Sequence, residues 1–190
     1  MSRLILDLDH TLLNTTAFKL ALANSLDLSV AEWDQAYTGF MQDNQLFRVD
    51  DFLQGVTAAQ RESFFQVVDH LRKYLYPDTL PFLQSAHTAG YQQTIVTFGE
   101  QDWQTRKLQG LHLPDYVQTV ATAGSKVAAL AELVNEDTLV VDDRATELEA
   151  IVAAYPQVVA YWITRPEGKY TEPIPQCPHH QIESLNQIKL

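Results

Sequence analysis

Residues 4–12, LILDLDHTL, decide the fold and much of the chemistry of this chain. The apolar residues predict a buried strand, which ends in two carboxylates, Asp7 and Asp9, followed by Thr11. Residues i and i+2 of a strand point the same way, so Asp7 and Asp9 converge if the strand geometry continues. Like charges held this close resist joint ionisation unless a cation lies between them. Oxygen ligands suit magnesium, so we expect Mg²⁺ at this strand end.

The composition limits the class of protein and its partners. A chain of 190 residues with 46% hydrophobic residues is one to two domains with a real core, not a disordered chain. A formal net charge of -11 disfavours nucleic acid and anionic membranes as partners. It would also repel a phosphate, so such a substrate needs local positive charge at its site. The single cysteine, Cys177, excludes an internal disulfide and fits a reducing compartment.

The pattern of charges also bears on location. Asp7 and Asp9 interrupt the apolar N-terminal stretch, so no signal peptide is expected, and no apolar run is long enough to span a bilayer. We therefore expect a soluble cytoplasmic protein that is a monomer or a small homo-oligomer.

Residues 15–76 predict a small helical bundle. Apolar residues recur at helical spacing, and no stretch alternates as a strand would. Ser29 with Glu32 predicts a capping box, Thr57 a second helix cap, and Pro77 the end of the block.

Residues 77–190 alternate between strands and helices, like residues 1–14 at the start of the chain. Strands are expected at 93–98, 117–121, 138–142 and 158–164, and helices at 80–89, 102–110, 126–135 and 145–155. Strands that are apolar on both faces favour an α/β fold, a doubly wound parallel sheet covered by helices on both sides. The four prolines of 165–178 predict a surface loop, and a short strand near 181–182 and a C-terminal helix close the domain.

Ligands of doubly wound sheets bind at the carboxyl ends of the strands, so the residues that follow each strand are the candidates. Thr97, Phe98 and Gly99 follow the second strand, where a hydroxyl can donate to a phosphoryl oxygen and a glycine permits close backbone approach. Lys126 opens a helix, where its charge opposes the dipole unless it reaches an anion. Lys107 and Arg106 are rival cations that we expect on a solvated helix face.

Two adjacent acids, Asp142 and Asp143, end the strongest later strand, and Glu147 follows one helical turn later. A helix cap would need only one of these acids. Asp143 is the first choice as a metal ligand, Asp142 the second, and Glu147 a third candidate.

Four elements follow one another along the chain: residues 7–11, residues 97–99, Lys126 and the acids at 142–143. In this order they resemble the motifs of the haloacid dehalogenase (HAD) superfamily in its phosphatase form. The first motif there is Asp-x-Asp-x-Thr, and the helical block matches the position and approximate size of the family's helical (C1-type) cap. The proline that commonly follows the motif lysine is missing after Lys126. The resemblance implies a Rossmann-like core of residues 1–14 and 77–190 and a cap of residues 15–76.

The resemblance also implies a mechanism. Asp7 would attack phosphorus, and Asp9 would act as acid and then base. Magnesium would be held by Asp7, the main-chain carbonyl of Asp9, and Asp143, with Asp142 or Glu147 assisting. Thr97 would hold phosphoryl oxygens beside Phe98 and Gly99, and Lys126 would offset their charge. Asp9 favours a phosphate ester, because dehalogenase and phosphonatase branches carry other residues there.

Some residues remain secondary candidates. Thr11 belongs to the phosphate side of the site, where we expect it to orient the loop, and His10 is expected to face solvent. In the helical block, aromatic residues are expected to form its core, whereas Arg48 could meet a second anionic group of the substrate. Cys177, His179 and His180 match no standard zinc spacing.

The leading hypothesis is a magnesium-dependent phosphatase acting on a small phosphorylated metabolite. A phosphotransferase or sugar-phosphate mutase would use the same aspartyl-phosphate. A receiver-like signalling domain would need an acceptor aspartate such as Asp50 or Asp51 after a buried strand, which 46–49 does not resemble. A non-catalytic binding module is disfavoured, since all four motif elements are present.

Overall fold

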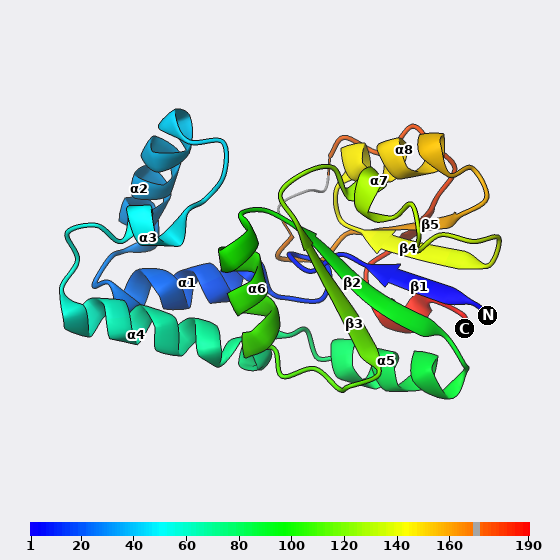
Figure 1. Cartoon of the computed structure of the whole chain (residues 1–190), viewed down its shortest axis with the longest axis horizontal. Coiled ribbons are helices and arrows are strands. Elements are labelled where there is room, and N and C mark those ends of the chain that lie inside the picture. Colours follow the sequence, from blue (N-terminus) through cyan, green and yellow to red (C-terminus); the bar gives the residue numbers. More distant parts are fainter. Residues whose placement is uncertain (169–171) are drawn as a thin grey trace.

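The computed structural model describes residues 1–168 and 172–190 and has a single six-stranded sheet as its centre (Figure 1). The strand order is β3-β2-β1-β4-β5-β6, and every pairing is parallel. The strands are β1 (Arg3–Leu6), β2 (Gln92–Phe98), β3 (Val117–Thr122), β4 (Thr138–Asp142), β5 (Val159–Ile163) and β6 (His180–Ile182). The predicted α/β fold with a doubly wound parallel sheet is thereby confirmed.

The first strand occupies the middle of the sheet. In the register, Leu6 lies opposite Ile95 of β2 and Val141 of β4. The chain segments that leave these three strands therefore begin at the same edge. This is where a ligand site of a doubly wound sheet is expected.

The side chains of β1 alternate between two cores. Leu4 and Leu6 belong to a cluster with Leu83, whereas Ile5 belongs to a second cluster with Leu148. The first face is covered by α5 (Thr79–Thr88), α6 (Gln101–Gly110) and the short 3₁₀ helix η2 (Leu185–Gln187), and the second by α7 (Lys126–Ala129) and α8 (Ala145–Ala154). Figure 1 shows α5 on one side of the sheet and α7 and α8 on the other. Burial on both faces explains the nearly continuous apolar strands.

Two of the expected helices differ from the structure. The helix predicted over 126–135 ends at Ala129, and the following amides of Ala131 and Leu133 bond to carbonyls three residues back, as in turns. The expected C-terminal helix is only the single turn η2. The segment after Ala129 still fills the second core, because Leu130 is buried.

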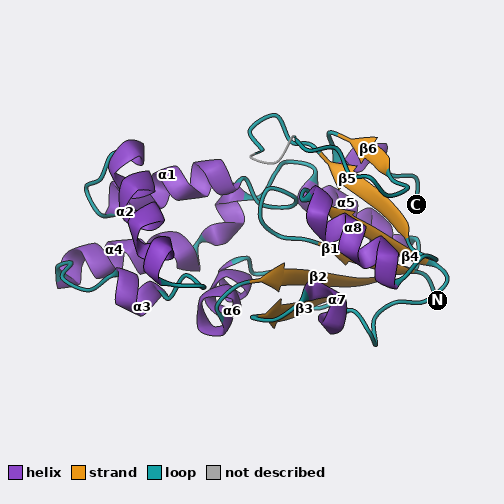
Figure 2. Ribbon diagram, turned by 90° about the horizontal axis from the view of Figure 1, so that it is seen from above, coloured by secondary structure: helices purple, strands orange, loops and turns teal. Residues whose placement is uncertain are grey.

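The regular secondary structure of residues 15–74 is entirely helical, and loops join the helices. The helices are α1 (Thr15–Ser25), α2 (Val30–Asp43), α3 (Val49–Phe52), α4 (Ala58–Asp69) and the 3₁₀ helix η1 (Leu71–Tyr74). The predicted capping box of Ser29 and Glu32 is present, and Thr57 forms a second one with Gln60. Figure 2 shows α1–α4 together at one end of the molecule, with α6 between them and the sheet. Trp103 of α6 packs against Phe47 and Phe64 of this helical part, with ring centroids 5.5 Å and 6.0 Å apart.

The helical part leaves and rejoins the sheet through two adjacent segments. The amide of Asn14 donates to the carbonyl of Tyr74 at 2.8 Å, and the amide of Tyr76 donates to that of Leu12 at 2.9 Å. These bonds lie at the boundaries predicted between core and cap. Whether the two parts are separate domains stays a prediction.

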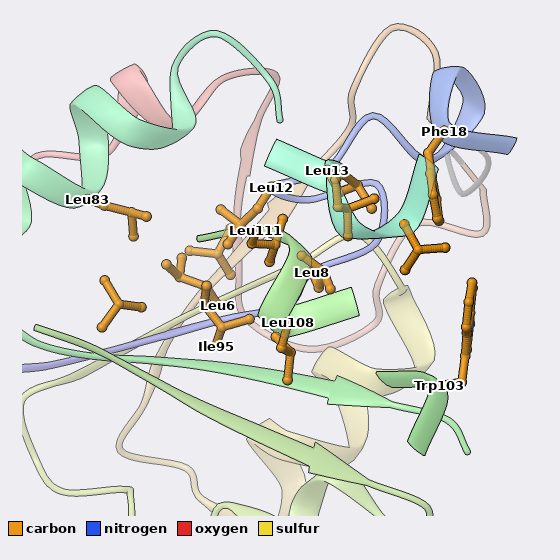
Figure 3. Packing of buried hydrophobic residues seen from close by; sticks show 14 of the residues in the cluster. Leu6, Leu8, Leu12, Leu13, Phe18, Leu83, Ile95, Trp103, Leu108 and Leu111 are labelled. Carbon is orange, nitrogen blue, oxygen red and sulfur yellow. The ribbon is translucent and has the colours of Figure 1, made fainter. Parts of the chain in front are cut away.

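The loop after β1 is anchored in the core. Figure 3 shows Leu8, Leu12 and Leu13 among Leu6, Ile95, Leu108 and Leu111. The three loop leucines have no exposed surface. Burying each contributes on the order of 2 kcal/mol, so the loop that carries Asp7 and Asp9 is held firmly.

The segment 165–178, predicted as a surface loop, begins with a buried residue; residues 169–171 lie outside the described part. The Arg165 guanidinium donates to both oxygens of Asp78, at 2.7 and 2.9 Å, and to the carbonyl of Thr11. Asp78 also accepts from the Ser184 hydroxyl and the Leu185 amide. One ion pair thus joins the loop after β1, the return from the helical part and the C-terminal segment.

Across the described residues, no helix is both long enough and apolar enough to cross a membrane.

Arg165→Met should lower the free energy of unfolding by about 3 kcal/mol, because it leaves the Asp78 carboxylate buried without its partner. Denaturant unfolding measures this. The control is Arg61→Met, which removes an exposed pair with Asp50 and should cost under about 1 kcal/mol. Equal losses in the two variants would contradict the assignment of Arg165 as a buried clamp.

Candidate active site

The centre of the site is a buried lysine between two carboxylates. Lys126 Nζ lies 2.5 Å from Asp7 Oδ1 and 2.6 Å from Asp142 Oδ2. Asp7 follows β1, Asp142 ends β4, and Lys126 opens α7. All three side chains are at most 8% exposed. The lysine thus reaches the anion that its unfavourable position at a helix start suggested.

Asp143 adds a third buried carboxylate. Its Oδ2 is buried and has no hydrogen-bond partner among residues 1–168 and 172–190. Asp7, Asp142 and Asp143 each offer an oxygen within 4.8 Å of the others. Three carboxylates with one unpartnered oxygen fit a hard divalent cation such as Mg²⁺, since such ions prefer oxygen ligands.

The electrostatics of this group support the same conclusion. Burial raises the pKa of Asp7 to about 7, and Asp142 and Asp9 add to the rise while Lys126 opposes it. Burial and then the charges of Asp7 and Asp142 raise the pKa of Asp143 to about 9. Burial alone would lower the pKa of Lys126, but Asp142 and Asp7 together raise it. One ammonium does not neutralise three carboxylates, so Asp7 and Asp143 resist ionisation until further positive charge arrives.

The carboxylate of Asp9 does not join this group, contrary to the convergence expected from the strand spacing. β1 ends at Leu6, and His10 adopts a left-handed backbone with φ of 58°. Asp9 Oδ2 instead lies 2.5 Å from Lys107 Nζ, and Oδ1 accepts from the Thr15 hydroxyl at 3.1 Å. Burial would raise the pKa of Asp9, but the Lys107 ammonium holds it below its usual value.

Thr97 and Gly99 are joined through Gln104 of α6. The Thr97 hydroxyl donates to Gln104 Oε1 at 3.1 Å, and Gln104 Nε2 donates to the carbonyl of Phe98 at 3.1 Å. A Cβ at Gly99 would lie 2.4 Å from Gln104 Nε2, and its φ is +153°. The glycine therefore makes room for the Gln104 side chain that orients Thr97.

Three other predicted residues occupy distinct surroundings. Thr11 is fully buried, so its side chain lines no open surface, and its carbonyl accepts from Arg165. This placement fits the orientation of the loop rather than contact with a substrate. Phe98 is 41% exposed at the end of β2. His10, expected to face solvent, is buried.

Glu147 and Arg48 are not brought to the three acids. Glu147 is on α8 and pairs with Arg144 at 3.5 Å, and its carboxylate is not part of the acidic group. Arg48 is exposed at the start of α3 and forms no ion pair with these carboxylates among the described residues. Asp142 is therefore better placed than Glu147 to assist Asp143.

A family profile described as haloacid dehalogenase-like hydrolase matches residues 1–154. The chain belongs to this hydrolase family. A search of curated protein sequences gives no match.

Solved structures of HAD-like hydrolases share the fold. One from Burkholderia xenovorans LB400 has a TM-score of 0.69 and 17% identity, over 98% of this chain and 94% of that one. A dehalogenase has a TM-score of 0.67 and 17% identity, over 98% and 95%. The HAD-hydrolase YfnB from Bacillus subtilis, bound to magnesium, has a TM-score of 0.64 and 14% identity, over 98% and 96%.

Sequence reasoning missed the role of α6 in this HAD-like site. Lys107 was expected on a solvated face but is 3% exposed, and Gln104 was not considered. The sequence carried a signal, the helical spacing of Trp103, Gln104, Lys107, Leu108 and Leu111. The structure shows that all five are buried. A lysine within such a stripe needs a buried anion as partner.

At pH 7, Asp143→Asn should raise the free energy of unfolding of the metal-free protein by at least about 1 kcal/mol, because burying the wild-type carboxyl beside other acids requires it to take up a proton, which asparagine does not need. The same variant should lose the rise in melting temperature that Mg²⁺ gives the wild type. Thermal unfolding with and without Mg²⁺ measures both effects.

The matched control is Glu147→Gln, which removes a carboxylate outside the acidic group and should keep the full Mg²⁺ effect. Loss of that effect in Glu147→Gln would instead place Glu147 in the metal site.

Proposed function

We propose that this HAD-like hydrolase is a magnesium-dependent phosphatase that acts on a small phosphorylated metabolite through an aspartyl-phosphate. The observation that carries the proposal is the separation of two neighbouring aspartates. Asp7 lies among Lys126, Asp142 and Asp143, whereas Asp9 is held apart by Lys107 and Thr15. A nucleophile and an acid/base need such different surroundings.

The carboxylates of Asp7, Asp142 and Asp143 would hold the metal, with the main-chain carbonyl of Asp9 as the family resemblance implies. Mg²⁺ bound there would supply positive charge for the phosphoryl oxygens. The magnesium bound to the Bacillus subtilis YfnB structure supports this choice of ion.

Asp7 would attack phosphorus, so that a bond from its oxygen to phosphorus forms as the ester P–O bond breaks. Because Lys107 holds the pKa of Asp9 low in the free protein, Asp9 would first take up a proton from solvent as the substrate binds and then give it to the leaving oxygen. In the second step Asp9 would take a proton from water, whose oxygen attacks phosphorus and releases Asp7. Lys126 would offset the charge on the phosphoryl group, and Thr97 would turn its hydroxyl proton from Gln104 Oε1 to one of the phosphoryl oxygens.

A dehalogenase is the main competitor within the family, since one similar structure is a dehalogenase. Asp9 favours the phosphatase, because protonating a leaving alkoxide needs an acid at this position whereas a leaving halide needs none. We further propose a cytoplasmic location, which the unpaired Cys177 supports. The net charge of -11 favours a small phosphorylated molecule over nucleic acid or a membrane as partner, whether the chain is a monomer or a small homo-oligomer.

Asp7→Asn should lower kcat for 4-nitrophenyl phosphate with Mg²⁺ by at least about 10³-fold, because an amide does not form the covalent intermediate. Phosphate release measures the activity, and Glu147→Gln is the matched carboxylate control. Full activity of Asp7→Asn, or wild-type activity that survives removal of all divalent metal, would refute the mechanism.

The wild type should release no halide from 2-chloropropionate under conditions in which it hydrolyses aryl phosphates. An ion-selective electrode measures chloride. Chloride release without phosphatase activity would assign the chain to the dehalogenase branch.

A further inference from the structure

The ion pair between Lys107 and Asp9 is the second buried charge pair of the site. Lys107 is 3% exposed, and its Nζ lies 2.5 Å from Asp9 Oδ2. The other oxygen of Asp9 accepts from the Thr15 hydroxyl, which also accepts from the His10 amide at 3.0 Å. Both oxygens of the carboxylate are therefore held, one from α6 and one from the start of α1.

The helix that supplies Lys107 contacts two other parts of the site. Gln104, one turn earlier, orients Thr97. Trp103 stacks on Phe18 of α1 with ring centroids 6.4 Å apart and packs against the aromatic side chains of the helical part. One face of α6 thus fixes Thr97 and Asp9 while its tryptophan is anchored in the helical part.

We propose that Lys107 is a positioning residue for Asp9, which holds the acid/base carboxylate apart from the buried acids so that it meets the leaving group. The proposal rests on the phosphatase function proposed above. It extends that function, because the four sequence motifs contain no residue that fixes the side chain of Asp9.

The location of the pair favours this role over a purely structural one. Burying an ammonium is costly, and an apolar side chain would fill the stripe of α6 more favourably. In the described part of the chain, Lys126 forms the ion pairs with the acidic group, whereas Lys107 pairs with Asp9. Without Lys107, the half-buried Asp9 would keep, of the side chains that the structure describes, the Thr15 hydroxyl as its hydrogen-bond partner.

The test compares kcat/KM for two substrates, 4-nitrophenyl phosphate and phenyl phosphate, since general-acid assistance matters more for the poorer leaving group, phenol. Lys107→Met should lower kcat/KM about tenfold for the first substrate and about hundredfold for the second. Asp9→Asn should show the same selectivity, and adding Lys107→Met to Asp9→Asn should cause little further loss. Lys107→Arg should recover part of the activity on phenyl phosphate.

The matched control is Lys19→Met, which also removes a lysine–aspartate pair, the exposed one with Asp34, and should change neither substrate's kcat/KM. The proposal would be overturned if Lys107→Met lowered kcat/KM equally for both substrates. It would also be overturned if the losses of kcat/KM in Lys107→Met and Asp9→Asn were fully additive in the double variant.

A measurement independent of activity separates this proposal from the proposed function. The loss of melting temperature caused by Lys107→Met should be smaller in the Asp9→Asn background than in the wild type. An equal loss in both backgrounds would overturn the proposal even in an active enzyme. Wild type without any phosphatase activity would instead refute the proposed function, and this cycle would still decide whether Lys107 holds Asp9.

Discussion

The rest of the structure depends on three carboxylates buried around one ammonium. Asp7, Asp142 and Asp143 are each at most 8% exposed, and in the described part of the chain Lys126 is the cation that pairs with two of them, Asp7 and Asp142. If all three were ionised, the group would carry an excess of negative charge in a medium that solvates charge poorly, so Asp7 and Asp143 hold their protons more strongly than free carboxylates do. Such an arrangement persists only if the surrounding fold supplies enough stability, and it becomes favourable when a cation binds.

The sheet provides that support. β1 pairs in parallel with β4, so Asp7, which follows β1, and Asp142, which ends β4, lie at the same edge of the sheet. The leucines after β1 fix the loop from the core side (Figure 3), and the Arg165–Asp78 pair fixes it from the other. The loop therefore has little freedom to move its carboxylates apart, and their repulsion is relieved by protonation or by a bound cation instead.

The parts of this protein that depend on local pattern were predictable. Strand positions follow from apolar runs, the capping box of Ser29 and Glu32 from its spacing, and the neighbourhood of Asp7, Lys126 and Asp143 from their places at strand ends. The side-chain contacts between residues far apart in the sequence were not predictable from such patterns. The turn at His10 directs Asp9 to Lys107, 98 positions away in the sequence, and Arg165 meets Asp78 across 87 positions. Apolar spacing also fails to show that the helix at Lys126 stops after one turn.

The two lysines explain how one short loop can carry two carboxylates with different chemistry. Asp7 shares Lys126 with Asp142, whereas Lys107 forms its ion pair, among the described residues, with Asp9. Burial, with the neighbouring acids, raises the pKa of Asp7, whereas the Lys107 ammonium holds the pKa of Asp9 low despite burial, although only one residue separates the two. Because Lys126 follows β3 and Lys107 belongs to α6, the two carboxylates are controlled by different parts of the fold. Trp103 of α6 packs on aromatic side chains of the helical part, and Thr15 of α1 bonds to Asp9, so in the described structure Asp9 is tied to the helical part from two elements.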